Sequence, residues 1–166
     1  IRDLNRNLEF RKAIKHAIDG KAFAKAMSKG PFVTVYAGGL ARDSAFFDAD
    51  ATSFFPYNPT GANSILDGLG LMDTDGNGVR NLPNGGGDLV INLVQNKGSE
   101  NEMLLGDGMA TMMAEVGIKI NIKPMEDTEP TRQAGEWDWL LVRSQQEMAF
   151  PNSGYWSDMG LSLIHI

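Results

Sequence analysis

The residues best suited to bind an ion lie in the segment GLMDTDGNGVRNLPNGGGDL, which spans residues 70–89. Asp73, Asp75 and Asn77 are spaced two residues apart and Gly78 follows them, which is the first half of a calcium-binding loop pattern. Such a loop needs about six to eight oxygen ligands, and one glutamate at its twelfth position usually supplies two of them. That position is Asn84 here, and glycines follow it where a helix would be needed. The segment therefore predicts a turn, and a calcium-binding extracellular module that uses Asp73, Asp75 and Asn77 is the alternative.

The remaining sequence offers no set of side chains that could carry out catalysis. It contains no cysteine, which excludes disulfides, thiolate metal sites and a cysteine nucleophile. Its two histidines, His16 and His165, form no transition-metal pattern. Neither the nucleophile motif G-x-S-x-G nor the phosphate-binding ending G-K-[ST] occurs. We therefore expect neither an enzyme nor a bound cofactor or metal.

The composition limits the partners that this chain can bind. The 166 residues include 21 acidic and 15 basic side chains, which gives a net charge of −6. An acidic chain is a poor match for the phosphate backbone, so nucleic acid is not expected as a partner. No apolar run of about 18 residues is present, so no membrane-spanning helix is expected. The chain begins at Ile1, without a methionine or a signal-like apolar segment, and we expect it to be a piece of a longer protein.

The spacing of apolar residues predicts alternating helices and strands. A long helix is expected over 7–29, with a kink or break near Gly20, and a shorter helix over 59–69. The most regular stretch is 88–123, where a strand rich in Val, Ile and Leu, a helix that ends at Gly117, and a strictly alternating strand follow one another. This order is typical of a βαβ unit with parallel strands and a right-handed crossover. The chain is therefore predicted to have an α/β fold.

A short helix over 127–135 and a strand over 137–143 are expected after this unit. We expect one sheet that contains residues 89–94, 118–123 and 138–142, with the first two strands parallel. The apolar side chains that should form the core are Ile14, Ile18, Leu66, Leu89, Ile91, Leu93, Met112, Val116, Ile118, Ile120, Ile122, Leu140 and Val142.

Three segments of the chain carry motifs whose order and spacing are specific. The segment FRKAIKHAIDGKAFAKAMSKG, residues 10–30, contains Ala-Ile-Asp and ends in glycine. The segment YNPTGANSILDGLGLMDTDGNGVRNLPNGG, residues 57–86, opens on Tyr-Asn-Pro and continues to the Asp-Gly-rich turn. The segment MMAEVGIKINIKPMEDTEPTRQAGEWDWLLVR, residues 112–143, holds Glu-Val-Gly-Ile before one strand and Gly-Glu-Trp-Asp before the next. Together they resemble the extracellular solute-binding proteins of ABC importers, of the oligopeptide- and dipeptide-binding type (family 5).

The match to this family extends over residues 8 to about 156 and includes some departures. Gly20 stands where the family usually has arginine, and Asn58 and Asn77 replace aspartate. In this family the Asp-Gly-rich loop is generally a turn rather than the transport site. The positions that match the family layout are Tyr57, Pro59, Leu66, Gly70, Leu71, Asp73, Asp75, Gly76, Gly78, Arg80, Glu115, Gly117, Ile118, Gly135, Trp137 and Asp138.

The resemblance implies that residues 1–160 are part of the C-terminal lobe of a two-lobed periplasmic-binding-protein-like fold. The apolar tail LSLIHI, residues 161–166, is of doubtful origin and is left out of the fold prediction. The implied function is to capture peptides or similar small solutes by closure of the lobes and to present them to an ABC permease in the membrane. The implied protein is a monomer, periplasmic or otherwise extracytoplasmic, and compatible with a lipid anchor at a missing N-terminus.

The loop after the strand at 137–143 is the candidate solute-binding segment. Ligands of open α/β sheets lie beyond the carboxyl ends of the strands, and in peptide-binding relatives the matching loop faces the cleft. An acidic side chain there, Glu147, could pair with a cationic group of the solute. Polar neighbours could donate or accept hydrogen bonds, and aromatic side chains could stack on the solute. The candidate solute-binding residues are Arg143, Gln145, Gln146, Glu147, Tyr155 and Trp156.

Overall fold

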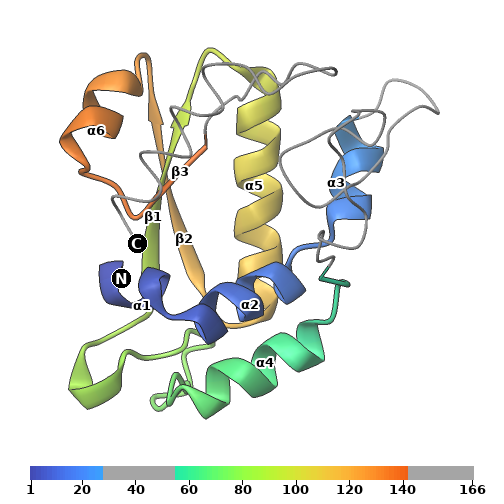
Figure 1. Cartoon of the computed structure of the whole chain (residues 1–166), viewed down its shortest axis with the longest axis vertical. Helices are drawn as coiled ribbons and strands as arrows, with labels where there is room; N and C mark the ends of the chain where they lie inside the picture. Colours follow the sequence, from blue (N-terminus) through green and yellow to red (C-terminus); the bar gives the residue numbers. More distant parts are fainter. Residues whose placement is uncertain (28–54, 142–166) are drawn as a thin grey trace, which may run out of the picture.

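The computed structural model describes residues 1–27 and 55–141. Helices and strands alternate through the second of these ranges, as the apolar pattern predicts (Figure 1). The helices are α1 (Arg2–Arg6), α2 (Leu8–Ala17), α3 (Gly20–Met27), α4 (Pro59–Gly68), α5 (Glu100–Glu115) and α6 (Glu129–Ala134), with a short 3-10 turn, η1, at Pro83–Gly85. The strands are β1 (Val90–Asn96), β2 (Lys119–Met125) and β3 (Trp139–Leu140).

The three strands form one parallel sheet in the order β2-β1-β3. Leu93 of β1 pairs with Ile122 of β2 on one side and with Trp139 of β3 on the other. Helix α5 connects β1 to β2 and packs along one face of these two strands (Figure 1). The βαβ prediction is therefore confirmed, although the strands begin one residue later than expected and β3 is shorter than 138–142.

Side chains at the starts of the helices explain where these elements begin. Asn7 accepts hydrogen bonds from the backbone N–H groups of Glu9 and Phe10 and caps α2. Asn58 caps α4 and Ser99 caps α5 in the same way. The side chain of Glu102 does not return to the N–H of Ser99, as a capping box would require, but accepts from the N–H of Asn96 at 2.9 Å. This bond fixes the end of β1 against the first turn of α5.

The helix predicted over 7–29 is interrupted near Gly20, as expected, and its described part forms two helices, α2 and α3, separated by Ile18 and Asp19. Ile18 has an extended backbone, with φ −98° and ψ 119°. The carboxylate of Asp19 then accepts from the N–H groups of Lys21 and Ala22, both at 3.0 Å, and so starts α3. The break anticipated near Gly20 therefore has a specific cause, which is the capping carboxylate just before the glycine.

The core lies where α2, α4 and α5 meet the sheet, and α2 packs against α4 (Figure 1). Phe10 is fully buried in it, and burial of an aromatic side chain of this kind contributes about 1.5–3 kcal/mol. Of the predicted core, Leu66, Leu89, Ile91, Leu93, Val116 and Ile118 are buried. The prediction overstated the burial of Ile14, Ile18, Met112, Ile120, Ile122 and Leu140, which are half-buried, and Val142 lies outside the described residues.

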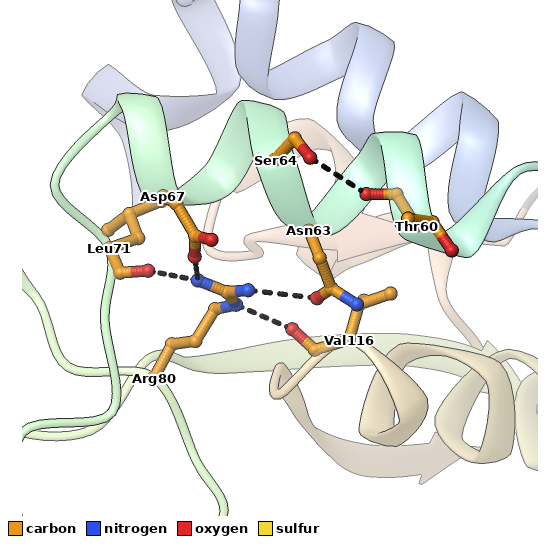
Figure 2. Close-up of polar contacts among 7 residues, drawn as sticks. All are labelled: Thr60, Asn63, Ser64, Asp67, Leu71, Arg80 and Val116. Carbon is orange, nitrogen blue, oxygen red and sulfur yellow. Dashed lines mark hydrogen bonds and ion pairs between the residues drawn. The ribbon is translucent and has the colours of Figure 1, made fainter.

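Arg80 holds the Asp-Gly-rich segment against two helices (Figure 2). Its guanidinium donates to the carboxylate of Asp67 at 2.6 Å and to the side-chain oxygen of Asn63 at 2.8 Å, both on α4. It also donates to the carbonyl of Leu71 and, at 2.7 Å, to the carbonyl of Val116 at the end of α5. The side chain is 10% exposed, so these four acceptors replace the water that it lost. Arg80 therefore joins α4, α5 and the following loop.

Within residues 1–27 and 55–141, every helix is too short or too polar to span a bilayer.

Candidate functional site

All six candidate solute-binding residues, Arg143, Gln145, Gln146, Glu147, Tyr155 and Trp156, lie outside the described residues, as does the tail at 161–166. The described chain ends at Leu141, one residue past β3. The parts of a site that the structure does place are therefore the residues around β3 and the Asp-Gly-rich loop.

The Asp-Gly-rich loop satisfies its own carboxylates. The two oxygens of Asp73 accept from the backbone N–H groups of Gly76 at 2.7 Å and Gly78 at 2.9 Å. The side-chain oxygen of Asn77 accepts from the N–H of Val79 at 2.7 Å. In the described part of the chain, no group of three or more acidic, histidine or cysteine side chains is placed to hold a metal ion. The turn prediction agrees with this geometry, and the calcium-binding alternative has no support.

These hydrogen bonds also set the charge state of the loop. The N–H of Gly78 is the largest cause of a lowered pKa for Asp73; desolvation, the next largest, opposes it, and the N–H of Gly76 acts in the same direction as that of Gly78. The carboxylate is therefore held in its charged form as part of the turn.

A groove of about 790 Å³ lies between α2 and the segment that leads into β3, and we call it the core-side groove. One wall is α2, and another is the chain just before α4. Its apolar lining includes Phe10, Ile14, Ile18, Phe55, Tyr57 and Trp139.

Two polar contacts fix the rim of the core-side groove. The Nδ1 of His16 lies 2.9 Å from the carbonyl oxygen of Pro56, and it must donate because a carbonyl can only accept. The ring of His16 also meets the ring of Phe55 edge-on, with 5.5 Å between the centroids. The hydroxyl of Tyr57 donates to the carboxylate of Glu115 at 3.0 Å, and this hydrogen bond is the largest cause of a raised pKa for Tyr57. The rim is thus tied to both α2 and α5.

The opposite face of the sheet carries a ladder of polar side chains. Asn121 of β2 donates to the side-chain oxygen of Asn92 of β1 at 2.9 Å. Asn92 in turn donates to the carboxylate of Asp138 from its side chain at 2.8 Å and from its backbone at 2.9 Å. A second groove, of about 730 Å³, lies over this ladder, and we call it the ladder-side groove. Its polar lining includes Arg2, Arg6, Asn92, Lys123 and Asp138.

The segment Trp137–Asp138–Trp139 borders both grooves. Asn5 of α1 holds it in place: its amide donates to the carbonyl of Asp138 at 3.1 Å, and its oxygen accepts from the indole N–H of Trp139 at 2.9 Å. Trp137 is 37% exposed, so its ring is available at the surface. The family motif Gly-Glu-Trp-Asp thus places one aromatic and one acidic side chain between the two grooves.

The sequence analysis missed Asn5 and Asn92 as parts of this arrangement. Asn92 stands out in the sequence as an amide inside the apolar run LVINLVQ, and it pairs in register with Asn121. An amide at this depth in a strand signals a hydrogen-bonding partner on the neighbouring strand. Asn5 gives no comparable signal, because its partners lie 133 and 134 residues away.

Comparison with known families gives one match that spans nearly the whole chain. Residues 2–161 match the family described as bacterial extracellular solute-binding proteins, family 5, middle region. The periplasmic alpha-galactoside-binding protein of Rhizobium meliloti (strain 1021) is 37% identical over 154 residues, which are 90% of this chain and 22% of that protein.

Solved structures agree with this match. The periplasmic binding protein MelB of Agrobacterium fabrum C58, solved in complex with stachyose, is 35% identical, with a TM-score of 0.81 over 88% of this chain and 23% of that one. The oligopeptide-binding protein AppA of Bacillus subtilis, in complex with a nonapeptide, has a TM-score of 0.76 at 20% identity over 90% of this chain and 30% of that one. The second likeness is one of fold alone. This chain spans less than a third of the length of each of these relatives.

Proposed function

Because this chain belongs to the bacterial extracellular solute-binding proteins of family 5, we propose that it is part of the solute-capturing component of an ABC importer. In such a protein, two lobes close on the solute by a hinge motion. The described residues form an α/β unit with a parallel sheet, which is compatible with part of one lobe, the C-terminal one. The match over residues 2–161 is the observation that carries this proposal.

We further propose that the solute is an oligosaccharide of the galactoside type rather than a peptide. The two relatives at 37% and 35% identity are an alpha-galactoside-binding protein and a protein in complex with stachyose. The peptide-binding AppA is 20% identical and supports the fold alone. The sequence resemblance favoured peptides, whereas the two relatives of higher identity are described by a galactoside and by stachyose.

A neutral sugar changes the roles proposed for the candidate contact residues. Glu147 would accept hydrogen bonds from hydroxyl groups instead of pairing with a cation, and Gln145 and Gln146 would donate and accept in the same way. Tyr155 and Trp156 would offer flat apolar faces to the C–H side of a sugar ring. These residues therefore remain candidates under either solute class.

The family assignment also defines the partners and the location that we propose. The captured solute is handed to a permease in the membrane, and the protein acts as a monomer outside the cytoplasm. The R. meliloti relative is a periplasmic protein, which supports the proposed location.

The test uses the longer protein that contains this chain, purified without bound solute. Isothermal titration with stachyose should give saturable binding to one site, and titration with a mixed-sequence oligopeptide should give none. Binding of the peptide without binding of the sugar would overturn the solute class and leave the family assignment intact.

The same titration tests Glu147. Glu147→Gln keeps the size of the side chain and removes its charge, so a real contact should weaken stachyose binding by about tenfold, or about 1.4 kcal/mol. Glu100→Gln is the matched control, because Glu100 is an exposed side chain at the start of α5 and lines neither groove. Unchanged affinity in Glu147→Gln would leave Tyr155 and Trp156 as the remaining aromatic candidates.

A further inference from the structure

Helix α3 lies beside α5 and contacts it at two points that are one helical turn apart on α5 (Figure 1). The ring of Phe23 in α3 lies against Gly108, where a Cβ would collide with it. Four residues further along α5, the sulfur of Met112 accepts a hydrogen bond from the backbone N–H of Asp19 at 3.3 Å. Residues four apart share one face of a helix, so both contacts belong to the same surface of α5.

The contact with Met112 is made by the residue that starts α3. The carboxylate of Asp19 caps this helix by accepting from the N–H groups of Lys21 and Ala22. Its own backbone N–H donates to the thioether of Met112, and a thioether is a weak acceptor. The sulfur of one methionine therefore holds the junction between α2 and α3 against α5.

The rest of α3 adds little covered surface among its described side chains. Phe23 is half-buried, and the exposed residues of this helix are Lys21, Ala22, Lys25 and Ala26. An element with few buried apolar contacts opens at a lower free energy than the core does. A weaker contact between Asp19 and Met112 should therefore release α3 while the sheet stays folded.

Three methionines differ in how far an oxidant can reach them. Met113 is fully buried in the core, and Met72 is 51% exposed. Met112 is half-buried, with one side packed against the core. Because the oxidation of a thioether depends on its exposure, Met112 and Met72 are open to a small oxidant and Met113 is protected.

We propose that Met112 is an oxidation site, and that its conversion to the sulfoxide by hydrogen peroxide releases α3 from α5. A lone pair of the sulfur attacks one oxygen of the peroxide and the O–O bond breaks. The attacked oxygen stays on the sulfur and gives its proton to the departing hydroxide, which leaves as water. The sulfur is oxidised by two electrons and the peroxide is reduced. This inference goes beyond solute capture and does not depend on the solute class.

The geometry around Met112 explains the release. An oxygen directed at the N–H of Asp19 would have to fit within the 3.3 Å that separates the sulfur from the nitrogen. An N–H···O bond alone needs about 2.9 Å, so the two helices would have to move apart. An oxygen directed away from this N–H would be drawn to water and would pull the side chain off the core, because the sulfoxide is polar. Both orientations of the oxygen break the contact between Met112 and Asp19.

Peptide mass spectrometry and amide hydrogen exchange, measured on the longer protein before and after peroxide treatment, test the proposal. Met112 and Met72 should each gain one oxygen atom, and Met113 should gain none. The amides of α3 should then exchange about tenfold or more faster than in the untreated protein, because the released helix opens more easily. The amides of β1 should exchange at the same rate in both samples, which reports that the sheet stays folded.

Two variants identify the sulfur that is responsible. Met112→Leu keeps an apolar side chain of similar volume and cannot be oxidised, so peroxide should leave the exchange of its α3 unchanged. Met72→Leu is the matched control, and its α3 should respond to peroxide as the unaltered protein does. Reduction by the two methionine sulfoxide reductases, one for each sulfoxide epimer, should restore slow exchange.

Three results would overturn the proposal. If Met112 stays unoxidised while Met72 is oxidised, peroxide does not reach its sulfur in the folded protein. If Met112 is oxidised and the exchange of α3 does not change, the thioether only fills space. If the response of α3 to peroxide persists in Met112→Leu, it originates at another methionine.

Discussion

The indole of Trp139 and the side chain of Asn5 are joined by a hydrogen bond of 2.9 Å, although 134 residues separate them. Asn5 also donates to the carbonyl of Asp138, so one amide joins α1 to the start of β3, and we call this pair of hydrogen bonds the Asn5 clasp. This clasp positions the segment that lies between the two grooves.

Asn5→Ala should destabilise the chain by about 1–2 kcal/mol, because it removes two hydrogen bonds and leaves the half-buried indole N–H without its acceptor. Urea unfolding measures the change. Asn101→Ala, at an exposed position of α5, is the matched control and should be neutral or slightly stabilising. Equal stabilities for the two variants would show that the clasp contributes nothing.

Arg80→Met should cost about 3 kcal/mol or more, because the carbonyls of Leu71 and Val116 would lose a buried donor. The control is Arg6→Met, since Arg6 pairs with a fully exposed Asp3 at 3.6 Å, and such surface pairs contribute about 0–1 kcal/mol. Thermal or urea unfolding of both variants separates the buried hydrogen bonds of Arg80 from the general effect of losing an arginine.

Gly106→Ala should destabilise the chain, although alanine favours a helix by about 1 kcal/mol over glycine. A Cβ at Gly106 would lie 1.8 Å from Oε1 of Gln95, which is fully buried on β1. Either the buried side chain of Gln95 must leave its position beside Met103 or the helix must shift away from the strand, at a cost of about 1–3 kcal/mol. Gly68→Ala is the control on α4, where a Cβ would meet nothing within 4 Å, and it should not destabilise the chain in this way.

A double variant identifies the cause of the destabilisation by Gly106→Ala. Shortening the strand side chain with Gln95→Ser should reduce the cost of Gly106→Ala, and the difference is measured as the coupling energy of a double-mutant cycle. A coupling of zero would show that the loss comes from the helix itself and not from the contact with β1.

Acid should weaken the Asp-Gly-rich loop in a way that depends on Asp73. The N–H groups of Gly78 and Gly76 lower the pKa of this carboxyl, so the stability it gives is present above its unfolded pKa and is lost as the pH falls through the lower folded pKa. Asp73→Asn should therefore reduce the fall in melting temperature between about pH 5 and pH 2.

Repeating the pH series with millimolar calcium should give the same melting curves, because the loop's own N–H groups already occupy both oxygens of Asp73. A calcium-dependent rise in melting temperature that is lost in Asp73→Asn would show that the loop binds calcium.

The local pattern of the sequence was enough to predict β1, α5 and β2, because β1 is a short run rich in Val, Ile and Leu, α5 ends before Gly117, and β2 alternates apolar and polar side chains. It was not enough to predict the burial of Ile14, Ile18, Ile120 and Ile122. Periodicity shows which face of an element is apolar, but burial also depends on what lies opposite that face, and these side chains are half-buried. The break before α3 comes from the capping carboxylate of Asp19, and the apolar pattern, which continues across the break, does not reveal it. The long-range clasp of Asn5 leaves no local trace at all.

The sequence separation of the contacts around the sheet also sets an order for folding during synthesis. The ladder bond between Asn92 and Asn121 spans 29 residues, whereas the Asn5–Trp139 bond spans 134. At about 5–20 residues per second, α1 leaves the ribosome on the order of ten seconds before its partner strand exists. The βαβ unit can close early over its short connection, and α2 can pack against α4 even earlier, whereas Asn5 of α1 has no partner until β3 has been made. In a nascent chain, α1 is therefore the helix that stays longest without its partner, until the tryptophan at position 139 has been made.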